Sequence, residues 1–103
     1  MEISEAQKKA KKLILHYGDF WPPLSMMARI TEEVGELARA INIKYGGKKS
    51  KGDGDGREIK EELADVLFTT LAMAEAQGID LEKVYERKVK DDYKKMKGVY
   101  FKE

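Results

Sequence analysis

The chain has 103 residues, the size of one domain with a modest hydrophobic core, so oligomerisation is an open route to stability. Charged residues make up 38 % of it but cancel to a net charge of +1, which argues against stable binding to nucleic acid or membranes through a one-signed excess. It has no cysteine and no apolar run near the roughly 20 residues of a transmembrane helix, which excludes disulfides, thiolate metal sites and membrane insertion and makes the cytoplasm the expected location.

A first helix is predicted from Ser4 to about His16. Ser4 and Gln7 have the spacing of a capping box, and apolar residues recur at helical intervals until Gly18, which is expected to end the helix. His16 is the only histidine in the sequence. A single histidine near a helix end is more typical of a structural or solvated side chain than of a metal ligand.

An aromatic and proline-rich corner follows the first helix. Pro22 and Pro23 remove two backbone donors and favour an extended chain before them, so this stretch is not a helix interior. Phe20 and Trp21, the only tryptophan, leave two interpretations open. They are either core side chains or an aromatic wall for a flat ligand such as a nucleobase.

The second helix is predicted from Pro23–Ser25 to about Lys44, because proline suits the first turn of a helix. Gly35 lies inside it, at a cost of roughly 1 kcal/mol relative to alanine. It is either a point of close approach for a neighbouring helix or a tolerated flaw. The apolar face expected to form the core consists of Leu24, Met27, Ile30, Val34, Leu37, Ala38 and Ile41.

Residues 45–56 are predicted to be a loop, because they are rich in glycine and lysine and nearly free of apolar side chains. Their alternating glycine and aspartate lack EF-hand spacing and its closing glutamate, which argues against calcium. Lys44, Lys48, Lys49 and Lys51 leave two interpretations open, a cationic lid over phosphates or a solvated linker.

Two further helices are predicted, from about Arg57 to Gln77 and from Leu81 to Lys97, separated by Gly78 as a C′ residue and Asp80 as an N-cap. Gly98 is expected to end the last helix, and the apolar tail 99–103 to pack on a neighbour or a second subunit. With no repeat and no convincing strand, the predicted fold class is all-α, a bundle of four to five helices completed by oligomerisation. The expected apolar stripes are Ile59, Leu63, Val66, Leu67, Thr70, Leu71 and Ala74, then Leu81, Val84, Tyr85, Val89, Tyr93 and Met96.

Carboxylates at helical spacing occur in both the second and third helices. Glu33 and Glu36 lie about 60° apart around the helix axis with Glu32 close by, and Glu62 and Asp65 repeat the i, i+3 spacing. Two antiparallel helices would bring both pairs into one site with four oxygen ligands. Carboxylates without histidine or cysteine select a hard cation, Mg²⁺ with Mn²⁺ as a substitute, although a solvated helix face explains the same spacing.

A Mg²⁺ ion held by carboxylates completes its shell with waters and phosphates, which favours phosphoanhydride hydrolysis. Glu32 or Glu61 is then available to take a proton from the attacking water. A di-iron site is disfavoured because it needs a Glu-x-x-His pair, which His16 does not form. Two other interpretations stay open: a non-catalytic helical interaction module with solvated acidic faces, and nucleic-acid binding through the loop lysines and those of residues 94–97.

The wider sequence around the carboxylates resembles a known family. Trp21-Pro22-Pro23-Leu24 ahead of Thr31-Glu-Glu-Val-Gly-Glu-Leu-Ala38, and later Glu61-Glu62-Leu63-Ala64-Asp65-Val66-Leu67-Phe68, resemble the two motif helices of the MazG-like nucleotide pyrophosphohydrolases. The resemblance extends from about Phe20 to Tyr93. It implies one all-α domain over residues 1–103, assembled as a homodimer or a tetramer.

The resemblance also implies a reaction, the Mg²⁺-dependent hydrolysis of a nucleoside triphosphate, standard, deoxy or non-standard, to a monophosphate and pyrophosphate. Glu32 is expected to orient or deprotonate the attacking water. Trp21 and Lys88 are the expected substrate contacts, but the residues after Lys88 depart from the family pattern and leave base and phosphate recognition open. The implied metal ligands are Glu33, Glu36, Glu62 and Asp65.

Overall fold

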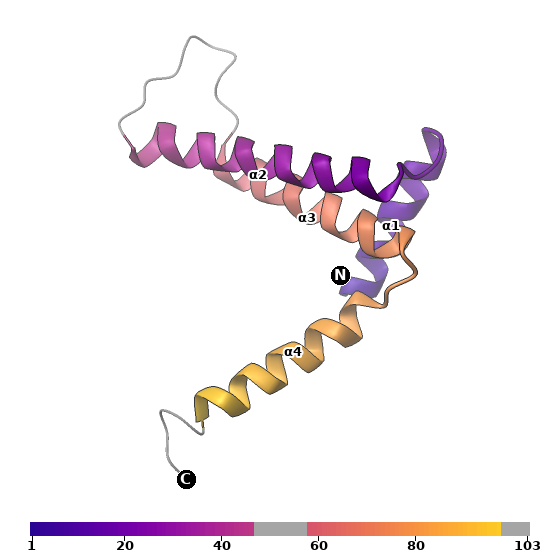
Figure 1. Ribbon diagram of the computed structural model, residues 1–103, viewed down its shortest axis with the longest axis vertical. Helices are drawn as coiled ribbons and strands as arrows, with labels where there is room; N and C mark the ends of the chain where they lie inside the picture. Colours follow the sequence, from indigo (N-terminus) through magenta and orange to yellow (C-terminus); the bar gives the residue numbers. More distant parts are fainter. Residues whose placement is uncertain (47–57, 98–103) are drawn as a thin grey trace.

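The computed structural model describes residues 1–46 and 58–97. Within these ranges the chain forms only helices: α1 (Ile3–His16), α2 (Pro23–Tyr45), α3 (Ile59–Ala76) and α4 (Leu81–Met96) (Figure 1). The predicted all-α fold class is therefore confirmed. Gly98, the apolar tail and three of the four lysines of the proposed lid fall outside the described residues, whereas Lys44 lies in the last turn of α2. None of the described helices is long and apolar enough to cross a membrane.

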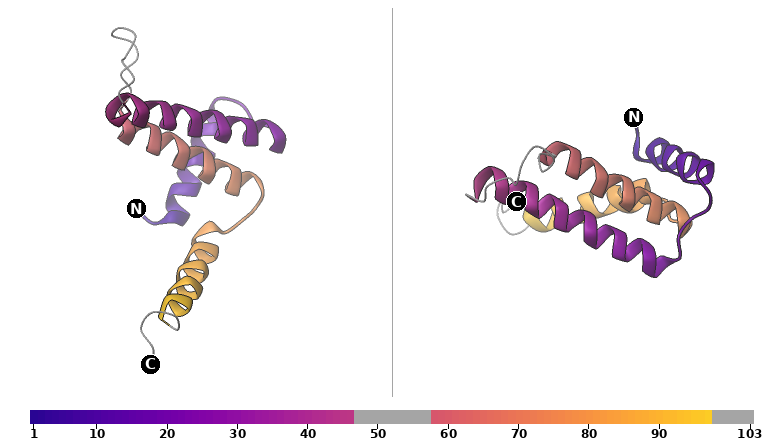
Figure 2. Two further views of the ribbon diagram at one scale, coloured as in Figure 1. Left: turned by 60° about the vertical axis from the view of Figure 1, so that its left-hand side comes forward. Right: turned by 90° about the horizontal axis from the view of Figure 1, so that it is seen from above.

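The helices do not close into a compact bundle. α2 and α3 lie side by side and antiparallel, α1 packs across α3, and α4 leaves the α3 end and extends away from the α2–α3 pair (Figures 1 and 2). The radius of gyration is 17.4 Å. A compact domain of this length has a value of about 13 Å. A single chain is thus markedly more open than an ordinary domain.

The predicted capping box at Ser4 and Gln7 is wrong, because α1 begins one residue earlier, with Glu2 as its N-cap. Ser4 lies inside the helix, and its backbone N–H donates to Glu82 Oε1 on α4 at 3.2 Å. Gln7 is buried and points toward the connection between α3 and α4. The two residues predicted to form a cap therefore make contacts with a distant segment of the chain instead.

The amide of Gln7 joins three helices. Its Nε2 donates to Glu75 Oε2 at 3.1 Å and to the carbonyl oxygen of Ile79 at 2.9 Å. Its Oε1 accepts from the backbone N–H of Leu81 at 2.9 Å. Both ends of the amide are satisfied, so one buried polar side chain fixes the start of α4 against α1 and α3.

Replacing Gln7 with alanine is expected to lower the free energy of unfolding by about 2–4 kcal/mol, because it opens a cavity and strips buried backbone groups of their partner. Urea unfolding followed by circular dichroism measures the effect. Lys8→Ala, at an exposed position of the same helix, is the control and should change stability by no more than about 0.5 kcal/mol. Equal stabilities for the two variants would refute the structural role of Gln7.

The connection between α3 and α4 has the predicted geometry. Gly78 adopts a φ of 68°, and the N–H groups of Gly78 and Ile79 donate at 3.1 and 2.9 Å to carbonyls in the last turn of α3, a Schellman motif. The Asp80 side chain accepts from the N–H of Lys83 at 3.3 Å and caps α4. Both end signals predicted here, Gly78 and Asp80, are confirmed.

The apolar core of the described residues is small, and the predicted core faces are only partly right. On α2 the buried side chains recur every seven residues and face α3: Met26, Glu33 and Ala40. The predicted stripe is displaced by one position and is largely exposed at Met27, Val34 and Ile41, as it is at Leu63 and Leu67 on α3. α4 has no buried residue, although its apolar stripe is intact in the sequence.

Among the described residues Gly35 is not a close-approach point, because a Cβ atom built there meets nothing of them within 4 Å. Gly35→Ala is therefore expected to raise the stability of the isolated chain by about 1 kcal/mol through helix propensity alone. Denaturant unfolding, with light scattering to determine the oligomeric state, measures this. A loss of stability accompanied by dissociation would instead show that a second chain packs against Gly35.

Candidate active site

Four carboxylates from α2 and α3 meet where the two helices pack together. One oxygen each of Glu33, Glu36, Glu62 and Asp65 lies within 4.8 Å of the other three. Helical spacing places each pair on one side of its helix, and antiparallel packing of α2 and α3 brings the two pairs face to face (Figure 1). The structure thus brings together the four residues that the sequence analysis singled out as metal ligands.

The cluster has the donor set and the size for a hard divalent cation. Oxygens bound opposite one another on Mg²⁺ are about 4.2 Å apart, twice the Mg–O distance of about 2.1 Å. The observed spread of 4.8 Å exceeds this by roughly half an ångström, which side-chain rotation supplies. No histidine belongs to the cluster among the described residues, so its chemistry favours Mg²⁺ or Mn²⁺ over zinc.

Glu33 is the most informative member of the cluster. Its side chain is 2 % exposed, and within the described ranges no hydrogen-bond donor reaches its buried Oε2. Burial raises the pKa of Glu33, Arg29 opposes that rise, and the nearby Glu36, Asp65 and Glu62 add to it. A buried carboxylate oxygen that lacks a donor and faces other carboxylates is what a cation site requires.

Arg29 is the cation beside this carboxylate, and the sequence analysis missed it. Its Nη2 lies 2.8 Å from Glu33 Oε1, and its Nη1 lies 3.6 Å from Glu32 Oε2. The i, i+3 and i, i+4 spacing of these residues was the available signal. Arg29 links the buried cluster to the exposed Glu32, which is not itself one of the four clustered carboxylates.

Glu61 has a role at the start of α3. It forms a capping box with Glu58, whose backbone N–H donates to Glu61 Oε1 at 3.5 Å. Glutamate is an unusual N-cap, which is why the sequence did not predict this box. Between the two carboxylates considered as proton acceptors, Glu32 is therefore the one not committed to a helix cap.

A cavity of about 320 Å³ opens directly beside the carboxylates. Glu33 and Asp65 form one wall, and the other walls include Trp21, Phe68 and Arg29. Trp21 is 55 % exposed, so it is not a core side chain of the single chain, and its role as an aromatic wall for a ligand stays a prediction. The other lining residues were not predicted as site residues: Leu13, Ile14, Tyr17, Asp19, Met26, Thr69 and Ala72.

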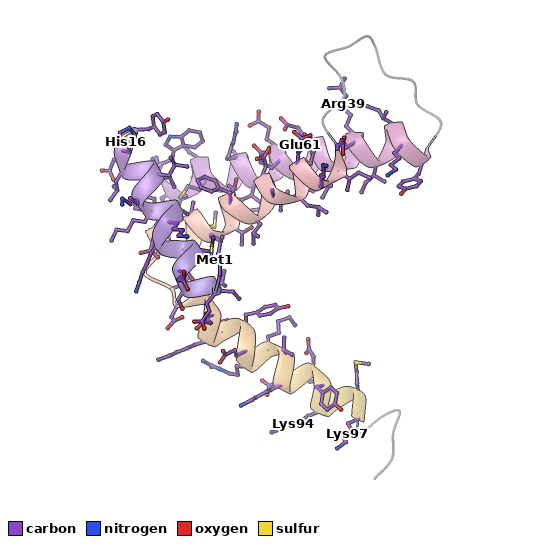
Figure 3. The ribbon with its side chains drawn as sticks, turned by 180° about the vertical axis from the view of Figure 1, so that it is seen from behind. Met1, His16, Arg39, Glu61, Lys94 and Lys97 are labelled. Atoms are coloured by element: carbon purple, nitrogen blue, oxygen red, sulfur yellow. The ribbon has the colours of Figure 1, made fainter. Side chains whose placement is uncertain are left out.

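Lys88 is not brought to the carboxylates within one chain. It lies on α4, which extends away from α2 and α3, and its Nζ pairs with Asp92 Oδ2 at 2.9 Å (Figure 1). Lys94 lies farther along the same helix and Lys97 directly after its end, both far from Glu61 on α3 (Figure 3). His16 lies at the end of α1 with its ring against Tyr17, at 5.0 Å between centroids.

The sequence that carries the carboxylate cluster is similar to that of known proteins. Residues 22–98 match the family model of the MazG nucleotide pyrophosphohydrolase domain, which covers most of the chain. The chain belongs to this family. The MazG match contains all four clustered carboxylates, Glu32, Arg29 and Lys88, and begins one residue after Trp21.

Individual relatives agree with the MazG assignment. The chain is 46 % identical to YpjD of Bacillus subtilis (strain 168) over 68 residues, which are 66 % of this chain and 61 % of that protein, so the match spans less than two thirds of the relative. The crystal structure of the B. subtilis protein superimposes with a TM-score of 0.77 at 36 % identity, over 86 % of this chain and 90 % of that chain. A Bacillus-conserved MazG protein, described as a nucleotide pyrophosphohydrolase, gives a TM-score of 0.73 at 38 % identity, over 88 % of each chain.

Proposed function

We propose that this chain hydrolyses a nucleoside triphosphate to a nucleoside monophosphate and pyrophosphate, with Mg²⁺ held by Glu33, Glu36, Glu62 and Asp65. The observation that carries the proposal is the cluster of four carboxylates of a MazG domain, two of them buried, beside a cavity lined by aromatic side chains. Mn²⁺ is the expected substitute metal. A cytoplasmic location, where nucleoside triphosphates are kept, is part of the proposal.

The proposed roles follow from the position of each side chain. When bound, Mg²⁺ neutralises phosphate oxygens and makes a bound water more acidic. Glu32, exposed beside the cluster, accepts a proton from the water that attacks the α-phosphorus. As the new P–O bond forms, the bond to the bridging oxygen breaks and pyrophosphate leaves.

Trp21 is proposed to stack on the base of the nucleotide, because it lines the cavity and presents an accessible ring. Trp21→Ala should raise KM about tenfold and leave kcat within about threefold, since base stacking contributes roughly 1–3 kcal/mol. Steady-state kinetics with saturating Mg²⁺ measures both constants. A fall in kcat at unchanged KM would contradict a stacking role.

Two copies of the chain are proposed to form the active enzyme. The exposed apolar residues of α2 and α3, together with the stripe on α4, leave the single chain with a small core and an extended shape. A homodimer, or a tetramer built from dimers, would cover them. Lys88 joins the proposed substrate contacts only in such an assembly, contributed by α4 of another copy.

The alternative, a non-catalytic interaction module with solvated acidic faces, fits the structure less well. Glu33 and Glu62 are only 2 % and 3 % exposed, so half of the cluster is not a solvated face. Binding of nucleic acid through Lys94 and Lys97 has little support from a net charge of +1.

A panel of standard, deoxy and oxidised nucleoside triphosphates, incubated with Mg²⁺ and scored for pyrophosphate, tests the proposal. At least one nucleotide should release pyrophosphate and monophosphate in equal amounts, and EDTA should stop the reaction. Release of orthophosphate would indicate cleavage at another bond. No hydrolysis across the panel, with no thermal stabilisation by Mg²⁺, would favour the interaction module.

A further inference from the structure

Arg29 occupies the position where the carboxylate cluster meets the cavity. Its Nη2 pairs with the buried Glu33 at 2.8 Å, while its own side chain is 45 % exposed. It lines the 320 Å³ cavity beside Trp21 and also a second, more open hollow that Trp21 and Glu32 share. A ligand that fills the cavity from Trp21 to the carboxylates therefore shares that cavity with this guanidinium.

Arg29 holds Oε1 of Glu33 and leaves Oε2 without a donor, so its competition with a metal ion at Glu33 is electrostatic. Both cations draw on the same carboxylate, and a divalent ion at the cluster repels the guanidinium that lies against one of its ligands. The order of the pair, with the cation four residues before the anion, is also the weaker one for helix stability. Helix stabilisation alone therefore gives a poor reason for placing arginine here.

If a metal ion displaces the Arg29 guanidinium from Glu33, the phosphates of the substrate offer it a new partner. The site contains four clustered carboxylates, with Glu32 at its edge, whereas a triphosphate is itself strongly anionic. Phosphate oxygens therefore need cations besides the metal, and the planar fork of arginine binds phosphate through two parallel hydrogen bonds. Arg29 can turn toward the cavity without crossing the protein, because it already lines that cavity.

We propose that Arg29 exchanges partners, holding Glu33 in the metal-free protein and binding the substrate's phosphates once a divalent cation has taken Glu33. This inference rests on the proposed function, because it assigns a phosphate-binding residue to that same site. It predicts effects of opposite sign for the two ligands. Arg29 should weaken the binding of the metal alone and strengthen the binding of phosphate to the metal-loaded site.

Calorimetric titrations of Arg29→Gln with two probes test the exchange. Mn²⁺ added to the metal-free variant should bind at least fivefold more tightly than to the wild type, because a competing cation is gone. Inorganic tripolyphosphate added with saturating Mg²⁺ should bind at least tenfold more weakly. Arg29→Lys, which keeps the charge but loses the fork, should bind Mn²⁺ like the wild type and tripolyphosphate more weakly.

Lys9→Gln removes one positive charge from an exposed position of α1, away from the cluster, and is the matched control; it should change neither affinity. Circular dichroism verifies folding, and Arg29→Lys carries the test if the glutamine variant does not fold. Unchanged or weaker Mn²⁺ binding by Arg29→Gln, or unchanged tripolyphosphate binding by either variant, would overturn the exchange while leaving the proposed function standing. A wild-type chain that neither binds Mn²⁺ nor hydrolyses any nucleotide would overturn both.

Discussion

Glu36→Gln and Asp65→Asn are each expected to lower Mg²⁺-dependent pyrophosphate release by about a thousandfold, since removing one preorganised electrostatic group commonly lowers kcat by 10²–10³. Each change removes one of the four clustered carboxylates and preserves side-chain shape. Glu36 is exposed and Asp65 is half-buried, so neither amide demands repacking. Circular dichroism should show unchanged helix content.

The matched control for these variants is Glu86→Gln, which removes an exposed carboxylate from α4, outside the cluster. It should retain full activity and the full thermal stabilisation by Mg²⁺. The two cluster variants should lose most of that stabilisation, because stabilisation by a ligand follows its affinity for the folded state. Full activity in both cluster variants would refute the proposed metal site.

Glu33→Gln is expected to stabilise the metal-free protein at neutral pH and to raise its Tm. Burial raises the pKa of Glu33 above its ordinary value of 4.5, so the ionised form is disfavoured in the folded state. Stability from this group is therefore greatest below the unfolded pKa and declines as pH rises toward the folded pKa. Glutamine imitates the protonated form and does not undergo this decline.

Thermal unfolding between pH 4 and pH 8 in EDTA measures the difference between variant and wild type. The stability advantage of the variant should be small at the acidic end and should grow above pH 4.5. It should stay constant once Glu33 is fully ionised. Mg²⁺ at about a hundred times its Kd should reverse the order, because it adds about 2.7 kcal/mol to the wild type alone. If the difference in Tm between variant and wild type became smaller as the pH rises, the pKa of Glu33 would not be raised in the folded protein.

The sequence predicted the helices well because their end signals act locally. Gly78 and Asp80 mark the α3–α4 turn within a few residues of where they act. Gln7 failed as a cap signal because its partners are more than sixty residues away, at Glu75, Ile79 and Leu81. A local sequence motif does not reveal that distant residues satisfy both ends of the same side-chain amide.

The core was predicted less well, for a physical reason. Periodicity identifies an apolar face but not the neighbour it packs against. On α2 the face toward α3 includes the charged Glu33, while the more apolar Val34 beside it is exposed. An acidic residue inside a helix interface breaks the usual pattern, and such breaks are expected at functional sites.

Some residues of the candidate site could be predicted from the sequence, and others could not. The four carboxylates were predictable because two helical pairs and a family motif agree on them. Phe68 was not, because its place in the cavity wall arises only where the helices pack together. Arg29 was overlooked, although its i, i+3 and i, i+4 spacing to two glutamates of α2 was a usable signal. Lys88, predicted as a substrate contact, is separated from the cluster in a single chain and stays a prediction for the assembled protein.

The amide of Gln7 has a mechanical consequence. It fixes the base of α4, whose 16 residues make a rod about 24 Å long, so a rotation of about 10° there displaces the far end by about 4 Å. Gln7 lies on α1, whose last turn contributes to the cavity wall, and it contacts Glu75 on α3. Other residues of α3, from Asp65 to Ala72, line the same cavity. A ligand that shifts these two helices slightly would move the tip of α4 as the end of a lever arm.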